Sequence, residues 1–374
     1  MNKPIKILIA TPLYPPDIGG PATYSKKLVE ELPKHDIDVD ILSFGEVKHL
    51  PKIIRHIVYF FYVLRRGKNI DIIYAQDPVS VGLPSALASF FLRKKFLLKI
   101  VGDYAWEQGM QRFGVEDLLD EFLAKKYNFR VETLRTIERF VARRAVRIVV
   151  PSEYLKTVVV RLGIDAQKVT VIYNDVALPK MIMTHDDARS QLGWKPNEVV
   201  FVSIGRLVPW KGFVVLIKSM KNILAQYPHA KLFIIGNGPQ YGYLRDTIYA
   251  AGLENNVYLL GVLTHDAVIK YLVAADVFLL NTGYEGFSHQ LLEAFAVGTP
   301  TITTDAGGNR EIVKENGNAL VADYNYQKAW VDMMLSVCAD KDLRKRLSTE
   351  SRLNVAKYQQ NRMIEKTASF LKSL

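Results

Sequence analysis

The sequence is poor in cysteine and has no long uninterrupted apolar stretch. Cys338 is the one cysteine in 374 residues, so no internal disulfide can form and a reducing compartment is expected. The longest apolar stretches, residues 53–64 and 87–101, contain basic side chains, and neither reaches the roughly 20 apolar residues that a membrane span requires. The apolar core of residues 1–10 is too short for a secretory signal and predicts a first strand. We therefore expect a cytoplasmic protein.

Composition indicates a soluble globular protein with an uneven charge. The chain is long enough for two domains, and its 49% apolar and 23% charged residues are ordinary for globular proteins. Residues 1–172 contain 27 Lys+Arg against 19 Asp+Glu, a balance of +8, whereas residues 173–374 contain 22 against 19, a balance of +3. A basic half favours an anionic partner such as a phosphate or an acidic lipid surface, although a merely basic surface is the alternative. A nucleic-acid-binding protein is a remote alternative that charge alone suggests, but no binding module is recognisable, so nucleic acid is not an expected partner.

The stretch from Glu285 to Glu293 has the pattern of a ligand site. It follows an apolar run and leads into a helical pattern, which is the strand–loop–helix layout found at the carboxyl edge of a parallel sheet. Gly286 permits a close approach of the backbone to a ligand, and Ser288 is a candidate N-cap whose helix would point free N–H groups at an anion. Glu285 lies in the predicted loop and Glu293 inside the predicted helix. Their two carboxylates are expected to contact different parts of one elongated ligand. Ordinary acids on a surface helix are the alternative.

Two motifs resemble those of a known enzyme family. The E-x7-E spacing, with Gly286 and Phe287 inside it and Ala-Phe-Ala-Val-Gly-Thr-Pro after it, resembles the signature of retaining, nucleotide-sugar-dependent glycosyltransferases of family 4. The stretch Gly-Arg-Leu-Val-Pro-Trp-Lys-Gly at 205–212 resembles the donor-phosphate motif of the same family. Arg206 and Lys211 in it suit a diphosphate, one as a forked donor and one as a point charge.

The resemblance implies an α/β architecture, the GT-B fold, in which two doubly wound Rossmann-like domains face each other across a cleft. Residues 1–172 are expected to form the acceptor-side domain and residues 173–357 the nucleotide-sugar donor domain. A terminal helix at about 358–374 is expected to pack back on the first domain. Nucleotide-sugar epimerases and sugar phosphorylases share this fold and are alternatives, but no lysine is marked out for the pyridoxal cofactor of a phosphorylase.

The implied reaction moves a sugar, with retention, from a nucleotide diphosphate sugar to an acceptor hydroxyl, in the synthesis of a cell-surface glycan or glycolipid. The resemblance assigns catalysis to Asp103, Arg206, Lys211 and Glu285. Glu285 would contact the donor sugar and Glu293 the ribose. Where the family often has histidine, this chain has Asp103. The expected donor-binding residues are Gly19, Gly20, Gly205, Gly236, Asn237, Val262, Leu263, Gly286, Phe287, Ser288 and Glu293.

No metal and no cofactor beyond the co-substrate are expected, because cations and not carboxylates would face the diphosphate. Asp38 and Asp40 spell the D-x-D metal motif of a different transferase fold. They lie on one face at the start of a strand, without the loop that such a site needs.

Two further stretches leave alternatives open. Residues 50–68 carry aromatic side chains between basic ends, which fits a helix packed on the sheet or a basic amphipathic helix on an anionic membrane. Residues 106–129 are rich in aromatics and charge without a clear period, which fits an insertion facing the acceptor or a simple surface loop. A glycan or lipid-linked acceptor is expected, and the membrane interpretation would add association of the protein with an anionic membrane surface.

Overall fold

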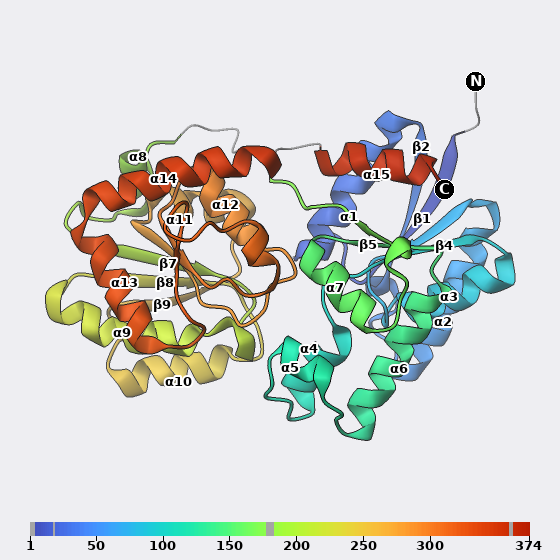
Figure 1. The fold of residues 1–374 in the computed structure, drawn as a ribbon, viewed down its shortest axis with the longest axis horizontal. Helices are drawn as coiled ribbons and strands as arrows, with labels where there is room; N and C mark the ends of the chain where they lie inside the picture. The colour runs from blue at the N-terminus through green and yellow to red at the C-terminus, as the bar shows by residue number, and fades with distance from the viewer. Residues whose placement is uncertain (1–3, 18, 177–182, 359–361) are drawn as a thin grey trace. The chain divides into compact units, whose positions relative to one another are not determined.

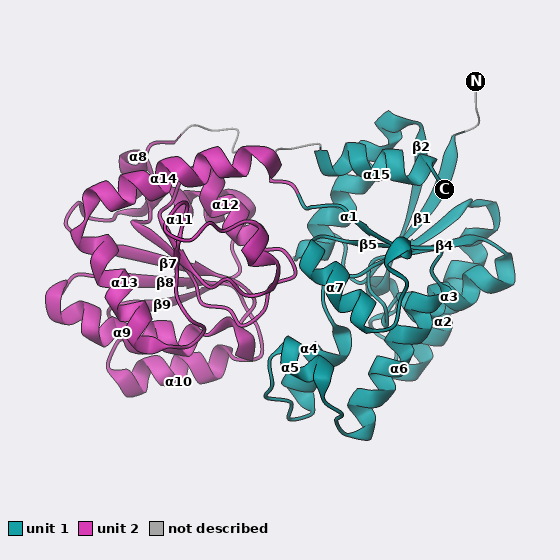
Figure 2. Ribbon diagram, in the orientation of Figure 1, with its two compact units in different colours: residues 1–174, 361–374 teal, residues 175–360 magenta. Residues whose placement is uncertain are grey.

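A computed structural model describes residues 4–17, 19–176, 183–358 and 362–374. The chain forms two compact units, coloured separately in Figure 2: residues 1–174 with 361–374, and residues 175–360. The division falls two residues beyond the expected boundary at 172, and the terminal segment joins the first unit from residue 361 instead of 358.

The first unit is built on a six-stranded parallel sheet with the order β2-β1-β3-β4-β5-β6. Its central strands are continuous apolar runs because both faces of a parallel sheet are covered by helices. In register, Ile7 of β1 lies opposite Val39 of β2 and Ile72 of β3. The strands are β1 (Ile5–Thr11), β2 (Ile37–Ser43), β3 (Ile72–Ala75), β4 (Lys95–Lys99), β5 (Arg147–Val150) and β6 (Val169–Val171).

Helices cover both faces of this sheet (Figure 1). Its helices are α1 (Gly20–Glu31), α2 (Lys52–Arg66), α3 (Gly82–Leu92), α4 (Tyr104–Arg112), α5 (Leu119–Ala124), α6 (Phe129–Arg144), α7 (Glu153–Arg161) and α15 (Arg362–Lys372). The terminal helix α15 contributes Met363, Ile364 and Leu371 to a core shared with β1 and α1. Across the described parts of the chain, no helix is both long and apolar enough to cross a bilayer.

Residues 106–129 are more ordered than either interpretation of the sequence implied. They contain most of α4, all of α5 and the first residue of α6. Trp106 is fully buried and donates through its indole nitrogen to the carbonyl of Asp117 at 2.9 Å. Phe122 is also buried, under the guanidinium of Arg135. The interpretation as a simple surface loop is therefore wrong, because the segment forms helices and buries Trp106 and Phe122, while the interpretation as an acceptor-facing insertion stays a prediction.

The second unit has a six-stranded parallel sheet with the order β12-β11-β10-β7-β8-β9. Its strands are β7 (Val200–Ile204), β8 (Lys231–Ile235), β9 (Val257–Gly261), β10 (Val277–Leu280), β11 (Thr301–Thr303) and β12 (Leu320–Val321). Its helices are α8 (His185–Leu192), α9 (Phe213–Gln226), α10 (Tyr241–Ala251), α11 (His265–Ala274), α12 (His289–Val297), α13 (Gln327–Ala339) and α14 (Lys341–Val355). The chain starts at the centre of the sheet with β7 and then builds outwards on each side, so this unit is a doubly wound, Rossmann-like fold.

The core of the second unit lies between the sheet and α9, α10 and α13. Phe201 and Leu279 from the strands pack with Leu216 of α9 and the fully buried Trp330 of α13. The indole nitrogen of Trp330 donates to the carbonyl of Asp323 at 3.1 Å, so the ring is buried without an unsatisfied polar group. The two α/β units confirm the expected fold class.

We predict that Ile364→Ala lowers the free energy of unfolding by about 2–5 kcal/mol, because it leaves a cavity in the core that α15 shares with β1. Urea unfolding followed by circular dichroism measures the change. Lys366→Ala, on the exposed face of the same helix, is the control and should alter stability by less than about 0.5 kcal/mol. Equal effects of the two substitutions would contradict this packing.

Candidate active site

The strand order of the second unit identifies one edge of its sheet as a site. β7 and β10 are neighbours, and the chain leaves them towards opposite sides of the sheet. In doubly wound sheets, ligands bind beyond the carboxyl ends of the strands at this switch point. The loops that follow β7 and β10 are residues 205–212 and 281–288, which carry the two motifs that the sequence singled out.

The loop after β7 is held by the loop after β8. Gly205 donates its N–H to the carbonyl of Ile235 at 3.0 Å, and Leu207 donates to the carbonyl of Asn237 at 3.0 Å. Gly236 has a φ of 139°, and a Cβ there would overlap with the carbonyl oxygen of Gly205. Glycine is therefore required for the two backbones to lie this close. Arg206, in the loop after β7, has an exposed side chain.

Lys211 and Glu285 form an ion pair between the loops after β7 and β10. Their side chains retain only 10% and 11% of their exposure. The main chain joins the same loops, since Gly283 donates its N–H to the carbonyl of Trp210 at 2.8 Å. The sequence predicted separate contacts, with the phosphate for Lys211 and the sugar for Glu285. The structure brings the two groups together at one point.

Asn281 stabilises the contact between the loops after β7 and β10, and the sequence did not predict this role. Its side-chain amide donates to the carbonyl of Gly212 at 2.9 Å and to Asn325 at 3.0 Å. Gly212 adopts a φ of 47° at the start of α9, where a Cβ would overlap with the Asn281 amide. A polar residue immediately after the buried strand β10 was the signal that could have identified it.

The loop after β10 also contacts the loop after β11. Gly308 donates its N–H to the carbonyl of Glu285 at 2.8 Å, and a Cβ on Gly308 would overlap with the carbonyl oxygen of Gly286. Ser288 is the N-cap of α12, as predicted, because its hydroxyl accepts from the N–H of Leu291 at 3.3 Å.

Phe287 lies inside the unit with 5% of its surface exposed, and its ring packs edge-on against Tyr358 with centroids 5.3 Å apart. A contact of Phe287 with a donor would therefore involve its main chain. Its large side chain serves packing.

Glu293 lies beside the loop after β9. Its carboxylate is 3.2 Å from Nε2 of His265, the first residue of α11, and the Glu293 side chain is 19% exposed. The hydrogen bond to Glu293 raises the pKa of His265 above its ordinary value of 6.5, and burial opposes this shift. Val262 and Leu263, which precede α11, are thereby placed near the carboxylate. His265 was missed because its partner lies 28 positions away in sequence.

Comparisons with known proteins identify the family of this chain. A family model described as glycosyl transferases group 1 matches residues 184–354, and one described as Glycosyltransferase Family 4 matches residues 18–178. The chain belongs to the family 4 glycosyltransferases. It is therefore an enzyme, a transferase that uses a nucleotide sugar.

Individual relatives span nearly the whole glycosyltransferase. An uncharacterized glycosyltransferase of Methanocaldococcus jannaschii is 26% identical over 89% of each chain. The UDP-Gal:alpha-D-GlcNAc-diphosphoundecaprenol alpha-1,3-galactosyltransferase of Escherichia coli is 26% identical over 90% of this chain and 89% of its own. Among solved structures, HepE of Anabaena, in complex with UDP and glucose, superposes with a TM-score of 0.80 at 20% identity, over 99% of this chain and 100% of that one.

The first unit of the glycosyltransferase places its predicted residues at strand ends. Gly19 is the N-cap of α1 and Gly20 its first residue, beyond the carboxyl end of β1. Asp103 follows β4 and caps α4, since its Oδ1 accepts from the N–H of Trp106 at 2.8 Å. Its Oδ2 is buried without a hydrogen-bond partner in the described residues, and burial raises its pKa. Asp103 thus shapes the start of α4, and its catalytic assignment remains a prediction.

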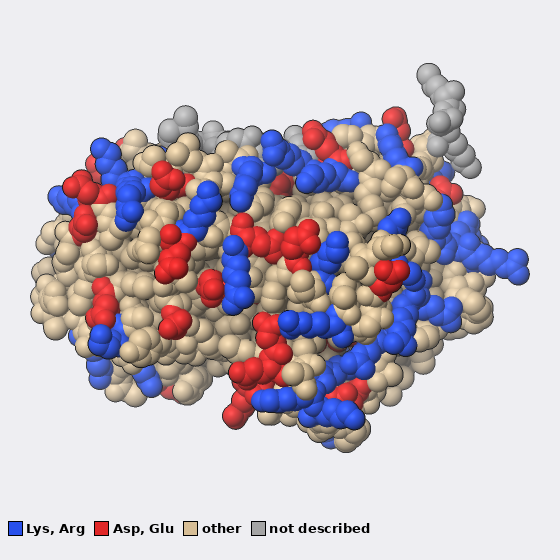
Figure 3. All heavy atoms as spheres, viewed as in Figure 1, with Lys and Arg blue, Asp and Glu red and all other residues tan. Residues whose placement is uncertain are grey.

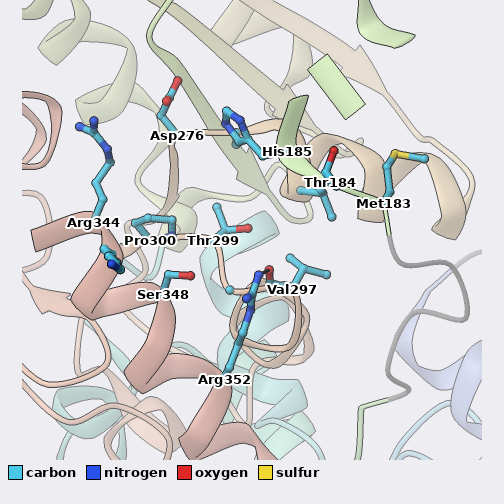
Figure 4. A pocket seen from close by; sticks show the side chains of 14 residues that line it. Met183, Thr184, His185, Asp276, Val297, Thr299, Pro300, Arg344, Ser348 and Arg352 are labelled. Atoms are coloured by element: carbon cyan, nitrogen blue, oxygen red, sulfur yellow. Dashed lines mark hydrogen bonds between the residues drawn. The ribbon is translucent and has the colours of Figure 1, made fainter. Parts of the chain in front are cut away.

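A separate hollow of about 550 Å³ opens at the amino ends of β10 and β11, the edge opposite the switch point (Figure 4). Arg344 and Arg352 of α14 border it, but each already donates to main-chain carbonyls, of Cys338 and Val297 respectively. None of the predicted site residues lines this hollow. Within the described residues, no group of three His, Cys, Asp or Glu side chains is arranged to hold a metal ion.

We predict that Glu293→Gln lowers the pKa of His265, which NMR titration of the imidazole measures. A raised folded-state pKa stabilises the protein below about pH 6.5, and this stabilisation disappears as the pH rises through the folded-state pKa. The stability difference between wild type and Glu293→Gln should therefore be larger at pH 6 than at pH 9, though below about 1 kcal/mol because His265 is half exposed. Glu254→Gln, on the surface of the same unit, should leave the titration unchanged.

Proposed function

We propose that the enzyme transfers a sugar, with retention of configuration, from a uridine diphosphate sugar to a hydroxyl of a lipid-linked glycan. The observation that carries this proposal is the Lys211–Glu285 pair at the switch point, with Arg206 exposed beside it. The choice of uridine is supported by the UDP complexes of HepE and by the donor in the name of the Escherichia coli relative.

The cations would bind the diphosphate. An arriving β-phosphate competes with Glu285 for the ammonium of Lys211, since phosphate and carboxylate accept the same charge-assisted hydrogen bonds. The N-terminus of α12, capped by Ser288, adds partial positive charge at this edge. Charge that develops on the leaving diphosphate is thus stabilised by fixed protein groups, and no metal ion or other cofactor is required.

The remaining donor atoms would be divided between two carboxylates. Glu293, beside Val262 and Leu263, accepts hydrogen bonds from the ribose hydroxyls, while the main chain after β9 holds the base. Glu285, released from Lys211, contacts the hydroxyls of the donor sugar. Lys211 and Glu285 are 74 positions apart in sequence. The parallel sheet brings their loops together and so fixes both groups before the donor arrives.

The chemical step would proceed on one face of the sugar. The bond from the anomeric carbon to the β-phosphate oxygen breaks as the acceptor oxygen forms its bond to the same carbon. The acceptor proton passes to the departing phosphate oxygen, so configuration is retained without a covalent intermediate.

The acceptor would be membrane-bound. The basic first half of the chain, with a balance of +8 from 27 basic and 19 acidic residues, suits a substrate presented at an anionic bilayer. The enzyme would then act as a peripheral protein on the cytoplasmic face, in the synthesis of cell-surface glycans.

We predict opposite effects of two isosteric substitutions on UDP binding. Glu293→Gln should weaken UDP by one to two orders of magnitude, because a charge-assisted hydrogen bond contributes roughly 1.5–3 kcal/mol. Glu285→Gln should leave UDP affinity intact or raise it, since Lys211 loses its competitor, while turnover collapses. Calorimetric titration with UDP and a transfer assay measure both, with Glu254→Gln as control. Equal losses of UDP affinity would contradict this division of roles.

We also predict full transfer activity after exhaustive treatment with EDTA, because Arg206 and Lys211 would supply the positive charge that a metal ion supplies elsewhere. Product formation is compared before and after chelation, and again after addition of Mg²⁺ or Mn²⁺. Activity that disappears on chelation and returns with a divalent ion would refute the metal-free arrangement.

A further inference from the structure

The first unit exposes an apolar face that its own fold does not cover. The exposed side chains of α2 include Ile53, Ile57 and Phe61, which recur every four residues and so lie on one side of the helix. Ile53 is 77% exposed and Phe61 is 59% exposed. Tyr59 and Val63 on the opposite side are fully buried. α2 is therefore packed on its unit through one face, which confirms the packing interpretation of this stretch, while the membrane interpretation stays a prediction.

The neighbouring helix α3 continues this face. α3 packs along α2 and exposes Phe90 and Phe91, the latter by 67%. The rings of Phe60 and Phe91 meet edge-to-face with centroids 6.0 Å apart, so the two exposed stripes join. We call the exposed apolar side chains of α2 and α3 the α2–α3 face. A continuous apolar face of this kind on a soluble protein marks an interaction surface.

A basic hollow borders the α2–α3 face. It has a volume of about 610 Å³ and lies where α3 ends, where β4 begins and where α6 ends. Arg93, Lys94 and Arg144 line it together with Phe90 and Phe91, and none of the described lining residues is acidic. The guanidinium of Arg144 lies 4.8 Å above the ring of Phe90, which places a cation directly over the apolar rim.

The charge around the face selects its partner. The sequences of α2 and α3 contain no Asp or Glu, and the exposed Lys52 and Arg65 lie near the two ends of α2, whereas Arg66 is paired with Asp40 and Glu46. In Figure 3, Lys and Arg side chains gather over the first unit, along the region of α6. A second copy of the chain would place like charges against each other on this face, which is unfavourable. An anionic bilayer offers both an apolar interior and negative headgroups.

We propose that the α2–α3 face inserts into the surface of an anionic bilayer and that the hollow formed by Arg93, Lys94 and Arg144 binds a lipid phosphate. This inference deepens the proposed function, on which it rests for the lipid-linked acceptor. Ile53, Ile57, Phe61 and Phe91 enter the region of the acyl chains, and the cations remain at headgroup level. None of the residues assigned to the candidate active site lines this hollow.

Binding of the purified full-length enzyme to vesicles tests the surface independently of catalysis. Wild type should sediment with vesicles of phosphatidylcholine and phosphatidylglycerol and should remain in solution with phosphatidylcholine alone. Arg93→Gln/Arg144→Gln should lower the partition coefficient on the order of tenfold to thirtyfold, because each basic residue near a charged surface contributes about a factor of five. Lys218→Gln/Arg245→Gln removes two exposed charges from the second unit and should bind as wild type.

The apolar half of the face is tested in the same assay. Phe61→Ser/Phe91→Ser should lose vesicle binding, whereas Tyr249→Ser/Leu353→Ser, which alters comparably exposed side chains of the second unit, should not. Equal binding by all four variants, or equal losses, would overturn the proposal. A wild-type oligomer that dissociates in Phe61→Ser/Phe91→Ser without lipid would also overturn it, because the face would then be a protein interface.

Transfer assays separate this inference from the proposed function. Two variants, Arg93→Gln/Arg144→Gln and Phe61→Ser/Phe91→Ser, should retain transfer to a water-soluble acceptor analogue. They should lose transfer only when the acceptor is embedded in vesicles. If wild type binds vesicles through this face but transfers no sugar to a lipid-linked acceptor, the proposed function fails while the membrane surface stands. If transfer occurs and vesicle binding is unaffected by the four substitutions, the membrane surface fails while the function stands.

Discussion

The ion pair between Lys211 and Glu285 joins the two loops on which the donor site depends. Withdrawing two charges from water is costly, and their mutual attraction offsets this only when the geometry is fixed by the surroundings. Here the surroundings are rigid: main-chain hydrogen bonds join the loops after β7 and β10, and Asn281 holds the turn at Gly212. The pairing also holds the ammonium group of Lys211 in place, where an anionic ligand can replace Glu285 as its partner.

Close contacts between backbones make this arrangement possible. Gly236 lies against Gly205, and Gly308 lies against Gly286, at positions where any side chain would overlap with a carbonyl oxygen. The four loops after β7, β8, β10 and β11 therefore behave as one layer over the sheet edge. Displacement of any loop would therefore move Glu285 or Lys211 with it.

Structural features that depend on residues close together in the sequence could be predicted from the sequence. Ser288 caps its helix as expected, because an N-cap hydroxyl bonds to N–H groups two or three residues away. The Lys211–Glu285 contact and the His265–Glu293 contact were not predicted, since they depend on strand order and on which helices adjoin. The helices within residues 106–129 were not predicted, because the aromatic and charged residues of this stretch show no clear helical period. The predicted roles of Asp103 and Phe287 depended on side-chain direction, which spacing in the sequence does not specify.

The same limit explains why α2 resisted a single interpretation. A helix on a parallel sheet needs only one apolar side, and Tyr59 and Val63 supply it. The additional apolar side chains at Ile53, Ile57 and Phe61 give the sequence apolar residues all round, which is typical of a fully buried helix. Yet basic residues at both ends of α2 make complete burial costly. A helix that is apolar on both sides and basic at its ends is compatible with an interface between protein, lipid and water. The apolar side chains on the outer side of α2 and α3 are exposed, so a lipid surface can contact them there.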